Sequence, residues 1–250
     1  MKDDDELVRE QHRLAALTPP PWSPDPHGIV AGGAFVAFAR GEQGPGRPGD
    51  RAHIGAAATR DTEELARLVV TGRAGASYAP GLLAAREGRM LEAAIRALLA
   101  TGVEPDVVLV DATGRDHPRR AGMALHLGVV LDVPTVGVTH RPLLATGPDP
   151  PDERGASTEL RLGGDVVGRW LRTRAGVRPV AVHAAWRTDD RTAADVVMRV
   201  VADARTPEPL RLARTAAREA RARDEGRTVE PAEASGSVGR PRPTSGERMR

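Results

Sequence analysis

Two acids and a histidine are spaced so that they could act together on a phosphate. Asp111 directly follows the apolar run 107–110, and His117 comes six residues later. Glu87 lies one turn before the apolar stripe of a predicted helix. Carboxylate oxygens are the ligands that hard cations such as Mg²⁺ prefer, and the bound ion keeps waters for phosphate chemistry. These side chains therefore indicate a metal-assisted site that hydrolyses a phosphodiester.

Each of these residues also has a purely structural interpretation. Asp111 could cap the turn before the next helix, and Glu87 could be an acid that the helix macrodipole favours near a helix start. Arg119 and Arg120 could form a solvated face or hold phosphates. Residue types alone leave these alternatives open.

The chain around Asp111 predicts a βαβ unit. A strand at 106–110 is followed by a turn, a helix at about 119–131 and a second strand at 135–138. Both strands are almost continuously apolar, which is typical of parallel strands covered on both faces. Ligands of such sheets bind at the carboxyl ends of the parallel strands. Asp111 lies at that end, and so does the segment after Val138.

Glu87 belongs to a helix whose buried face is visible in the sequence. Apolar residues recur there at helical spacing, namely Leu91, Ala94, Ile95, Leu98 and Leu99. Glu87 leans toward the same side, where a carboxylate is costly unless it is paired or near the rim.

The remaining segments complete a mixed sheet. Three nearby strands at 29–38, 52–58 and 65–70 suggest an antiparallel meander. A hairpin at 160–162 and 166–171, a strand at 180–183, and helices at 6–17, 188–204 and 208–223 are also expected. The predicted fold class is α/β, with antiparallel first strands, then parallel strands, and helices on both faces of the sheet.

The composition fits one domain followed by a tail. The chain has 250 residues, of which 40% are hydrophobic, enough to bury a core. It contains no cysteine, which excludes disulfides and Cys-ligated metals. We expect a domain at 1–223 and a disordered tail at 224–250, where almost nothing is available to bury. The acidic start and the lack of a long apolar stretch favour an intracellular soluble protein.

Bulk charge does not identify a nucleic-acid-binding protein. The formal net charge is only +2, although the isoelectric point is about 9.8 because the basic residues are almost all arginine. Any nucleic-acid binding must therefore come from a local patch. The arginine-rich helix at 208–223 is interpreted as a solvated face rather than as a second nucleic-acid contact.

Four segments resemble the endonuclease V (deoxyinosine 3′-endonuclease) family, in the same order as in that family. They are SYAPGLLAAREG at 77–88, VVLVDATGRDHPRRAGMALHLGVVLDVPTVGV at 107–138, LRTRAGVRPVAVHAAW at 171–186 and PEPLRLARTAAR at 207–218. The resemblance spans roughly residues 6–223. It implies a ribonuclease-H-like fold and Mg²⁺-dependent cleavage of DNA near a deaminated adenine, and some members cut inosine-containing RNA.

The resemblance also implies roles for individual residues near the phosphate. Glu87 and Asp111 match two metal-binding carboxylates. His117 matches the histidine of the family's HPRR stretch, close to the metal and the scissile phosphate. Arg119 and Arg120 belong to that stretch and are expected to hold phosphates.

A second implied feature is a wedge that enters the distorted duplex beside the flipped inosine. Tyr78 and Pro80 match this wedge, while Ser77 and Ala79 replace the proline and isoleucine that are usual in the family. Extruding a base costs a few kcal/mol, and the cost is smallest for a damaged pair, which supplies part of the selectivity.

The chain departs from the family pattern at the predicted site. Ala34 stands where the family carries an essential aspartate, and no acid lies between residues 29 and 39. His140 replaces a lysine, and it could offer a proton or a hydrogen bond to phosphate. Trp186 replaces a histidine, and a D-G-H-G turn reads Asp111-Ala112-Thr113-Gly114. Asp116 is an extra acid that could serve as a substitute ligand.

Two hypotheses follow. The first is an endonuclease V-type phosphodiesterase of reduced activity, dependent on Mg²⁺ or Mn²⁺, acting in DNA repair on inosine-containing DNA or RNA. Glu87 and Asp111 would hold the metal, and His117 and His140 would act at the phosphate. The second is a catalytically inactive, ribonuclease-H-like protein that binds nucleic acid without cutting it. Residue 34 separates the two, and in both cases we expect a cytoplasmic monomer without membrane contact.

Overall fold

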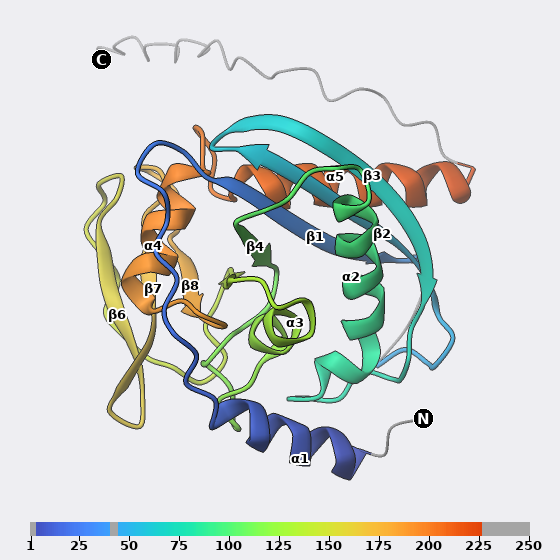
Figure 1. Cartoon of the computed structure of the whole chain (residues 1–250), viewed down its shortest axis with the longest axis horizontal. Coiled ribbons are helices and arrows are strands. Elements are labelled where there is room, and N and C mark those ends of the chain that lie inside the picture. The colour runs from blue at the N-terminus through green and yellow to red at the C-terminus, as the bar shows by residue number, and fades with distance from the viewer. Residues whose placement is uncertain (1–3, 41–44, 227–250) are drawn as a thin grey trace, which may run out of the picture.

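The computed structural model describes residues 4–40 and 45–226. Within these residues, eight strands form one sheet in the order β3-β2-β1-β4-β5-β8-β7-β6 (Figure 1). The strands are β1 (Val30–Phe38), β2 (Arg51–Arg60), β3 (Glu63–Arg73), β4 (Val107–Val110), β5 (Thr135–Thr139), β6 (Ser157–Leu162), β7 (Asp165–Leu171) and β8 (Val180–Ala184). The helices are α1 (Asp4–Ala15), α2 (Leu83–Leu99), α3 (Met123–Leu131), α4 (Asp190–Arg199) and α5 (Glu208–Asp224). Most of the predicted tail, residues 227–250, lies outside the described part.

The strand directions confirm the predicted mixed sheet. β1, β2 and β3 form an antiparallel meander, and β4 runs parallel to both β1 and β5. The β6–β7 hairpin joins β8 on the far side in antiparallel pairing. Ala34 pairs with Val110 across the β1–β4 ladder, which places residue 34 beside the chain that leads into Asp111.

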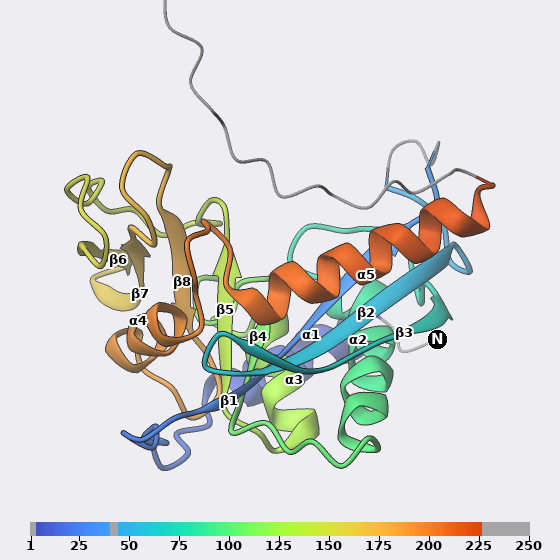
Figure 2. The ribbon, with the colours of Figure 1, turned by 90° about the horizontal axis from the view of Figure 1, so that it is seen from above.

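Helices cover both faces of the sheet (Figure 2). Ala34, Val108 and Val110 pack with α2 and α3 on one face. The alternate residues Val107 and Leu109 pack with α4 and the start of α5 on the other. The strands are buried on both sides, which explains their continuous apolar sequence. None of the helices in the described residues is long and apolar enough to cross a membrane.

Helix α5 approaches the sheet unusually closely. A Cβ added at Gly55 of β2 would lie 2.0 Å from the carbonyl oxygen of Ala213, and one at Gly33 of β1 would lie 2.8 Å from the backbone of Pro209. Glycine at these two positions lets the helix backbone rest on the strands. The close approach brings the middle of α5 to the carboxyl end of β4.

Two predicted helices are longer than the helices in the structure. The helix expected at 119–131 begins only at Met123, because Arg120 adopts the left-handed conformation at φ 57° and Gly122 is the extended N-cap. The helix expected at 188–204 begins at Asp190, after the N-cap Asp189, and ends at Arg199. The segment between Arg199 and α5 is irregular.

Candidate active site

Glu87 and Asp111 lie close enough for the charge of one to act on the other. Asp111 directly follows β4, and Glu87 lies in the second turn of α2. Burial raises the pKa of Glu87 from 4.5 to about 7, the neighbouring Arg86 opposes this rise, and the Asp111 carboxylate adds to it. Glu87 is therefore about half protonated at neutral pH.

Arg214 of α5 occupies the other side of Asp111. Its Nη2 atom lies 3.0 Å from Oδ2 of Asp111, and the two side chains are only 19% and 30% exposed. Sequence reasoning missed this residue and treated its helix as a solvated face. The signal was present, because Arg214 follows the buried Leu210 by four residues and precedes the buried Ala217 by three, so it borders the packed face.

These residues do not fit a divalent metal site. Within the described part of the chain, no group of three His, Cys, Asp or Glu side chains could hold an ion. Ala34 offers no ligand, Arg214 holds Asp111, and Glu87 would have to release its proton first. A metal ion would therefore compete with both a guanidinium and a proton for two carboxylates.

Asp116 is a structural residue, which makes it unsuitable as a substitute ligand. It is completely buried, and its carboxylate accepts backbone hydrogen bonds from Leu143 at 2.7 Å, Leu144 at 2.9 Å and Ala145 at 2.8 Å. Its Oδ2 lies 3.7 Å from Nδ1 of the fully buried His183. Burial lowers the pKa of His183 to about 4, so this histidine is neutral.

His117 uses both of its ring nitrogens within the protein. Its Nδ1 accepts a hydrogen bond from the backbone N–H of Arg119 at 3.2 Å, so Nε2 carries the proton and donates to the carbonyl of Gly81 at 3.1 Å. The side chain is only 3% exposed, and burial lowers its pKa. These contacts hold the loop that carries Tyr78 and Pro80.

The two arginines that follow His117 are also engaged by the protein. Arg119 donates to the carbonyl of Gly81 at 2.8 Å and to Gln11 of α1 at 2.5 Å. Arg120 reaches the β6–β7 hairpin, where it donates to the carbonyl of Leu162 at 2.6 Å and to Asp165 at 3.2 Å. In this arrangement both residues fasten loops together.

A cavity of about 240 Å³ opens beside Tyr78. Its lining comes from several segments: Gln11, Tyr78, Gly81, Leu83, Ala84, Ala112, Thr113, His117, Gly122, Met123, Thr139, Arg141, Pro142 and Leu143. Tyr78 is 50% exposed at the rim, and Pro80 is exposed in the same loop. The cavity combines apolar walls with a few hydrogen-bonding groups, as small-ligand sites do.

His140 lies just after β5, and Arg214, which pairs with Asp111, also acts on His140. Partial burial and the positive charges of Arg205 and Arg214 lower its pKa, and the Asp111 carboxylate opposes this. His140 is therefore mostly neutral at pH 7.

Residues 25–215 match the sequence model of endonuclease V. The chain belongs to the endonuclease V family. It is 44% identical over 164 residues to endonuclease V of Methanopyrus kandleri, covering 66% of this chain and 69% of that one. It is 45% identical over 136 residues to that of a Roseiflexus species, covering 54% and 60%.

Solved endonuclease V structures share the fold. The Streptomyces avermitilis enzyme has a TM-score of 0.77 at 31% identity, over 90% of this chain and 95% of that one. An endonuclease V of Ciona intestinalis bound to inosine-containing DNA has a TM-score of 0.76 at 20% identity, over 90% and 100%. The predicted family and ribonuclease-H-like fold are confirmed. The endonuclease V family consists of metal-dependent nucleases.

Proposed function

We propose that this chain recognises inosine-containing nucleic acid, acting as a cytoplasmic monomer, and that it has lost metal-dependent cleavage. The ion pair between Arg214 and Asp111 carries the proposal, because it engages the carboxylate that directly follows the parallel strand β4, at its carboxyl end. The recognition elements beside it remain.

The cavity next to Tyr78 supports recognition of an extruded base. At about 240 Å³ it is smaller than pockets for drug-sized ligands, which suits a single base. Tyr78 is exposed at its rim, where an aromatic ring can fill the gap that the flipped base leaves in the stack. Gln11, His117 and Arg119 all donate to the carbonyl of Gly81, so the wedge loop is held in place before a ligand binds.

The chemistry of the two carboxylates supports the loss of cleavage. Mg²⁺ in phosphate-transfer sites is held by one or two ionised carboxylates together with waters and substrate phosphates. Glu87 is half neutral, Asp111 is paired with a guanidinium, and residue 34 carries only a methyl group. The proton on Glu87 and the guanidinium beside Asp111 therefore balance these two carboxylates without a metal ion.

A second candidate is the weakened Mg²⁺- or Mn²⁺-dependent phosphodiesterase that the sequence first suggested. One observation favours it, namely that the charge of Asp111 acts on Glu87 and raises its pKa, so the two carboxylates lie near each other. In this case the metal would compete with Arg214 for Asp111.

One experiment separates the two candidates. End-labelled DNA and RNA strands with one inosine, single-stranded and duplex, are incubated with the protein in Mg²⁺, in Mn²⁺ and in EDTA. Unmodified strands of the same sequence are the controls, and both binding and product formation are recorded. We expect preferential binding of inosine strands in all three conditions and no product.

Two variants sharpen the result. Tyr78→Ala should lower the preference for inosine by about tenfold, because stacking on one base is worth roughly 1–3 kcal/mol, while the fold remains intact. Cleavage by the wild type that disappears in Asp111→Ala would establish the weakened phosphodiesterase. Equal binding of inosine and unmodified strands would refute lesion recognition.

A further inference from the structure

Arg214 pairs with Asp111, the charge of Asp111 acts on His140 and Arg218, and Arg205 in turn acts on His140. Arg214 and Arg218 lie on successive turns of α5, Arg205 lies just before that helix, and His140 lies just after β5. We call His140, Arg205, Arg214 and Arg218 the cationic cluster. Three of its members carry a permanent charge, whereas Asp111 is the one acid that acts on both His140 and Arg218.

An aromatic ring holds two members of the cluster side by side. The guanidinium carbons of Arg214 and Arg218 lie 5.0 and 5.6 Å from the centroid of the Phe35 ring. A ring face attracts each cation, but the two cations repel each other, and the charge of Arg214 lowers the pKa of Arg218. An anion placed between the guanidinium groups of Arg214 and Arg218 would remove this repulsion.

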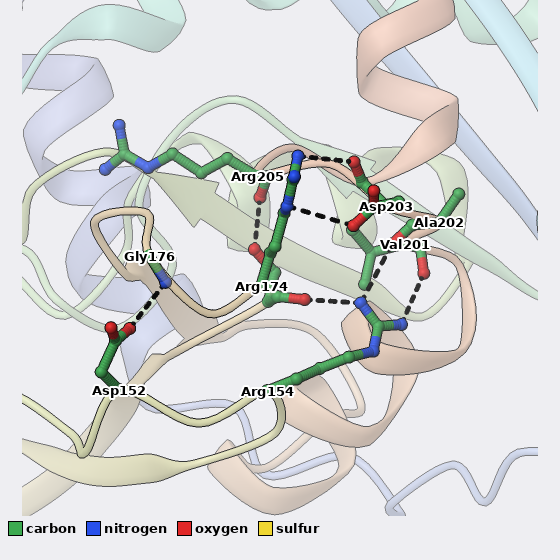
Figure 3. Close-up of polar contacts among 9 residues, drawn as sticks. Asp152, Arg154, Arg174, Gly176, Val201, Ala202, Asp203 and Arg205 are labelled. Atoms are coloured by element: carbon green, nitrogen blue, oxygen red, sulfur yellow. Dashed lines mark hydrogen bonds and ion pairs between the residues drawn. The ribbon is translucent and has the colours of Figure 1, made fainter. Parts of the chain in front are cut away.

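A hydrogen-bond network fixes the backbone that carries Arg205 (Figure 3). The carbonyl of Arg205 accepts from Oγ1 of Thr173 at 2.9 Å. Arg154 donates to the carbonyls of Thr173, Val201 and Ala202 at 2.5, 3.0 and 3.0 Å. The side chain of Arg205 points away from this network in Figure 3, and its Nη2 donates to the carbonyl of Pro179 at 2.8 Å, which holds the side chain in place.

The cluster has more positive charge and more donors than its own contacts use. Burial and the charges of neighbouring arginines, Arg214 among them, lower the pKa of Arg205 and of Arg218. The Nε atoms of Arg205 and Arg214 are buried and have no hydrogen-bond partner within the described residues. A buried donor without a partner is unfavourable, and a bound oxyanion would relieve it after a small side-chain movement.

We propose that the cationic cluster binds a backbone phosphate of nucleic acid directly, in the place where a metal ion would otherwise neutralise it. This rests on the proposed function and adds the means by which the strand is held. Guanidinium groups match phosphate oxygens in a bidentate fork. Arg214 would turn from Asp111 to the phosphate, Arg205 and Arg218 would complete the positive surface, and neutral His140 would donate a hydrogen bond.

The first test is binding in the absence of metal. Fluorescence anisotropy with inosine-containing and unmodified strands is recorded in EDTA over a series of salt concentrations. Arg214→Gln and Arg218→Gln should each weaken binding about tenfold for both strands and lower the salt slope by about one. Arg96→Gln is the matched control, because Arg96 is exposed near the end of α2 and pairs only with surface groups of α2 and α3; it should bind as the wild type does.

The second test uses the acid itself. If Asp111 competes with the phosphate for Arg214, Asp111→Asn should bind as tightly as the wild type or a few-fold more tightly. If Asp111 is a metal ligand needed for binding, the same change should weaken it. Arg214→Lys keeps the charge without the planar fork and should lie between wild type and Arg214→Gln, and circular dichroism confirms that each variant is folded.

The proposal and the proposed function fail separately. Binding that prefers inosine but disappears in EDTA would overturn the cationic cluster and leave lesion recognition standing. Metal-independent binding that Arg214→Gln weakens, with no preference for inosine, would support the cluster and overturn lesion recognition. Weaker binding by Asp111→Asn in EDTA would also overturn the cluster.

Discussion

Replacing Glu87 by glutamine tests the electrostatic state of the site. The pKa of Glu87 is raised from 4.5 to about 7, mainly by burial, with Asp111 adding to the rise. In the unfolded chain the same carboxyl group ionises near 4.5. Between about pH 4.5 and pH 7, the folded protein therefore keeps a proton on Glu87 that the unfolded chain has already released.

The sign and size of the effect follow from linkage. Because the folded state binds the extra proton, stability is fully present below about pH 4.5 and is lost as pH rises through about 7. A difference of one pKa unit corresponds to ~1.4 kcal/mol, so ionising Glu87 costs at most about 3 kcal/mol; partial exposure reduces this through solvent screening. Glutamine cannot ionise, so Glu87→Gln avoids this cost.

The measurement is urea unfolding of the wild type and of Glu87→Gln at intervals from pH 4.5 to 8.5. The stability of the variant relative to the wild type should rise with pH, by up to about 3 kcal/mol, and level off above pH 8. Glu92→Gln is the control on the same helix, since Glu92 is paired with Arg96 at the surface. A constant difference, or a wild type that gains on the variant as pH rises, would show that Glu87 is stabilised as an anion and refute the reasoning.

Three further predictions concern the scaffold and the metal. Asp116→Asn should destabilise the protein by about 3 kcal/mol in urea unfolding, because an amide cannot accept three backbone N–H groups as the carboxylate does; an unchanged midpoint would contradict this role. Gly55→Ala should lower the free energy of unfolding by about 3 kcal/mol, because its Cβ would overlap α5. Gly88→Ala should raise it by ~0.5–1 kcal/mol, because a Cβ at this helical position would make only ordinary van der Waals contacts. If both substitutions changed stability in the same direction, the packing argument would be wrong. Millimolar Mg²⁺ or EDTA should change the melting temperature by no more than about 1 °C, because an ion stabilises a protein only when it binds the folded state and we expect no Mg²⁺ to bind there. A clear upward shift of the melting temperature with Mg²⁺ would reveal a metal site.

The fold was predictable where the burial of an element leaves a local pattern of apolar residues in the sequence. The runs at 107–110 and 135–138 are almost continuously apolar because both faces of these strands are covered, and the structure has β4 and β5 there. Helix boundaries were less accurate. Residues 119–122 carry nothing that forbids a helix, but Arg119 is drawn to the carbonyl of Gly81 and Arg120 turns left-handed. Tertiary contacts of this kind leave no local pattern.

The site was predictable only in part for the same reason. Asp111 and Glu87 are indicated by the strand end and by the helical stripe, which are local features. Arg214 reaches Asp111 from 103 residues further along the chain, and only the packing of α5 on Gly33 and Gly55 brings it there. Periodicity places Arg214 at the edge of a buried face, but it does not say which strand that face covers.

The charges around Asp111 indicate that the alanine at 34 and the arginine at 214 belong together. Ala34 is 2% exposed and packs among apolar side chains beside Val110, so an aspartate there would bury a further carboxylate next to Glu87 and Asp111. Such a cluster is stable only with a cation to neutralise it. Without that third acid, one guanidinium suffices for Asp111 and a proton suffices for Glu87. Returning an aspartate to position 34 alone would therefore repel both existing carboxylates and raise the pKa of Glu87 further, and the site would take up a metal ion only if Arg214 were also removed.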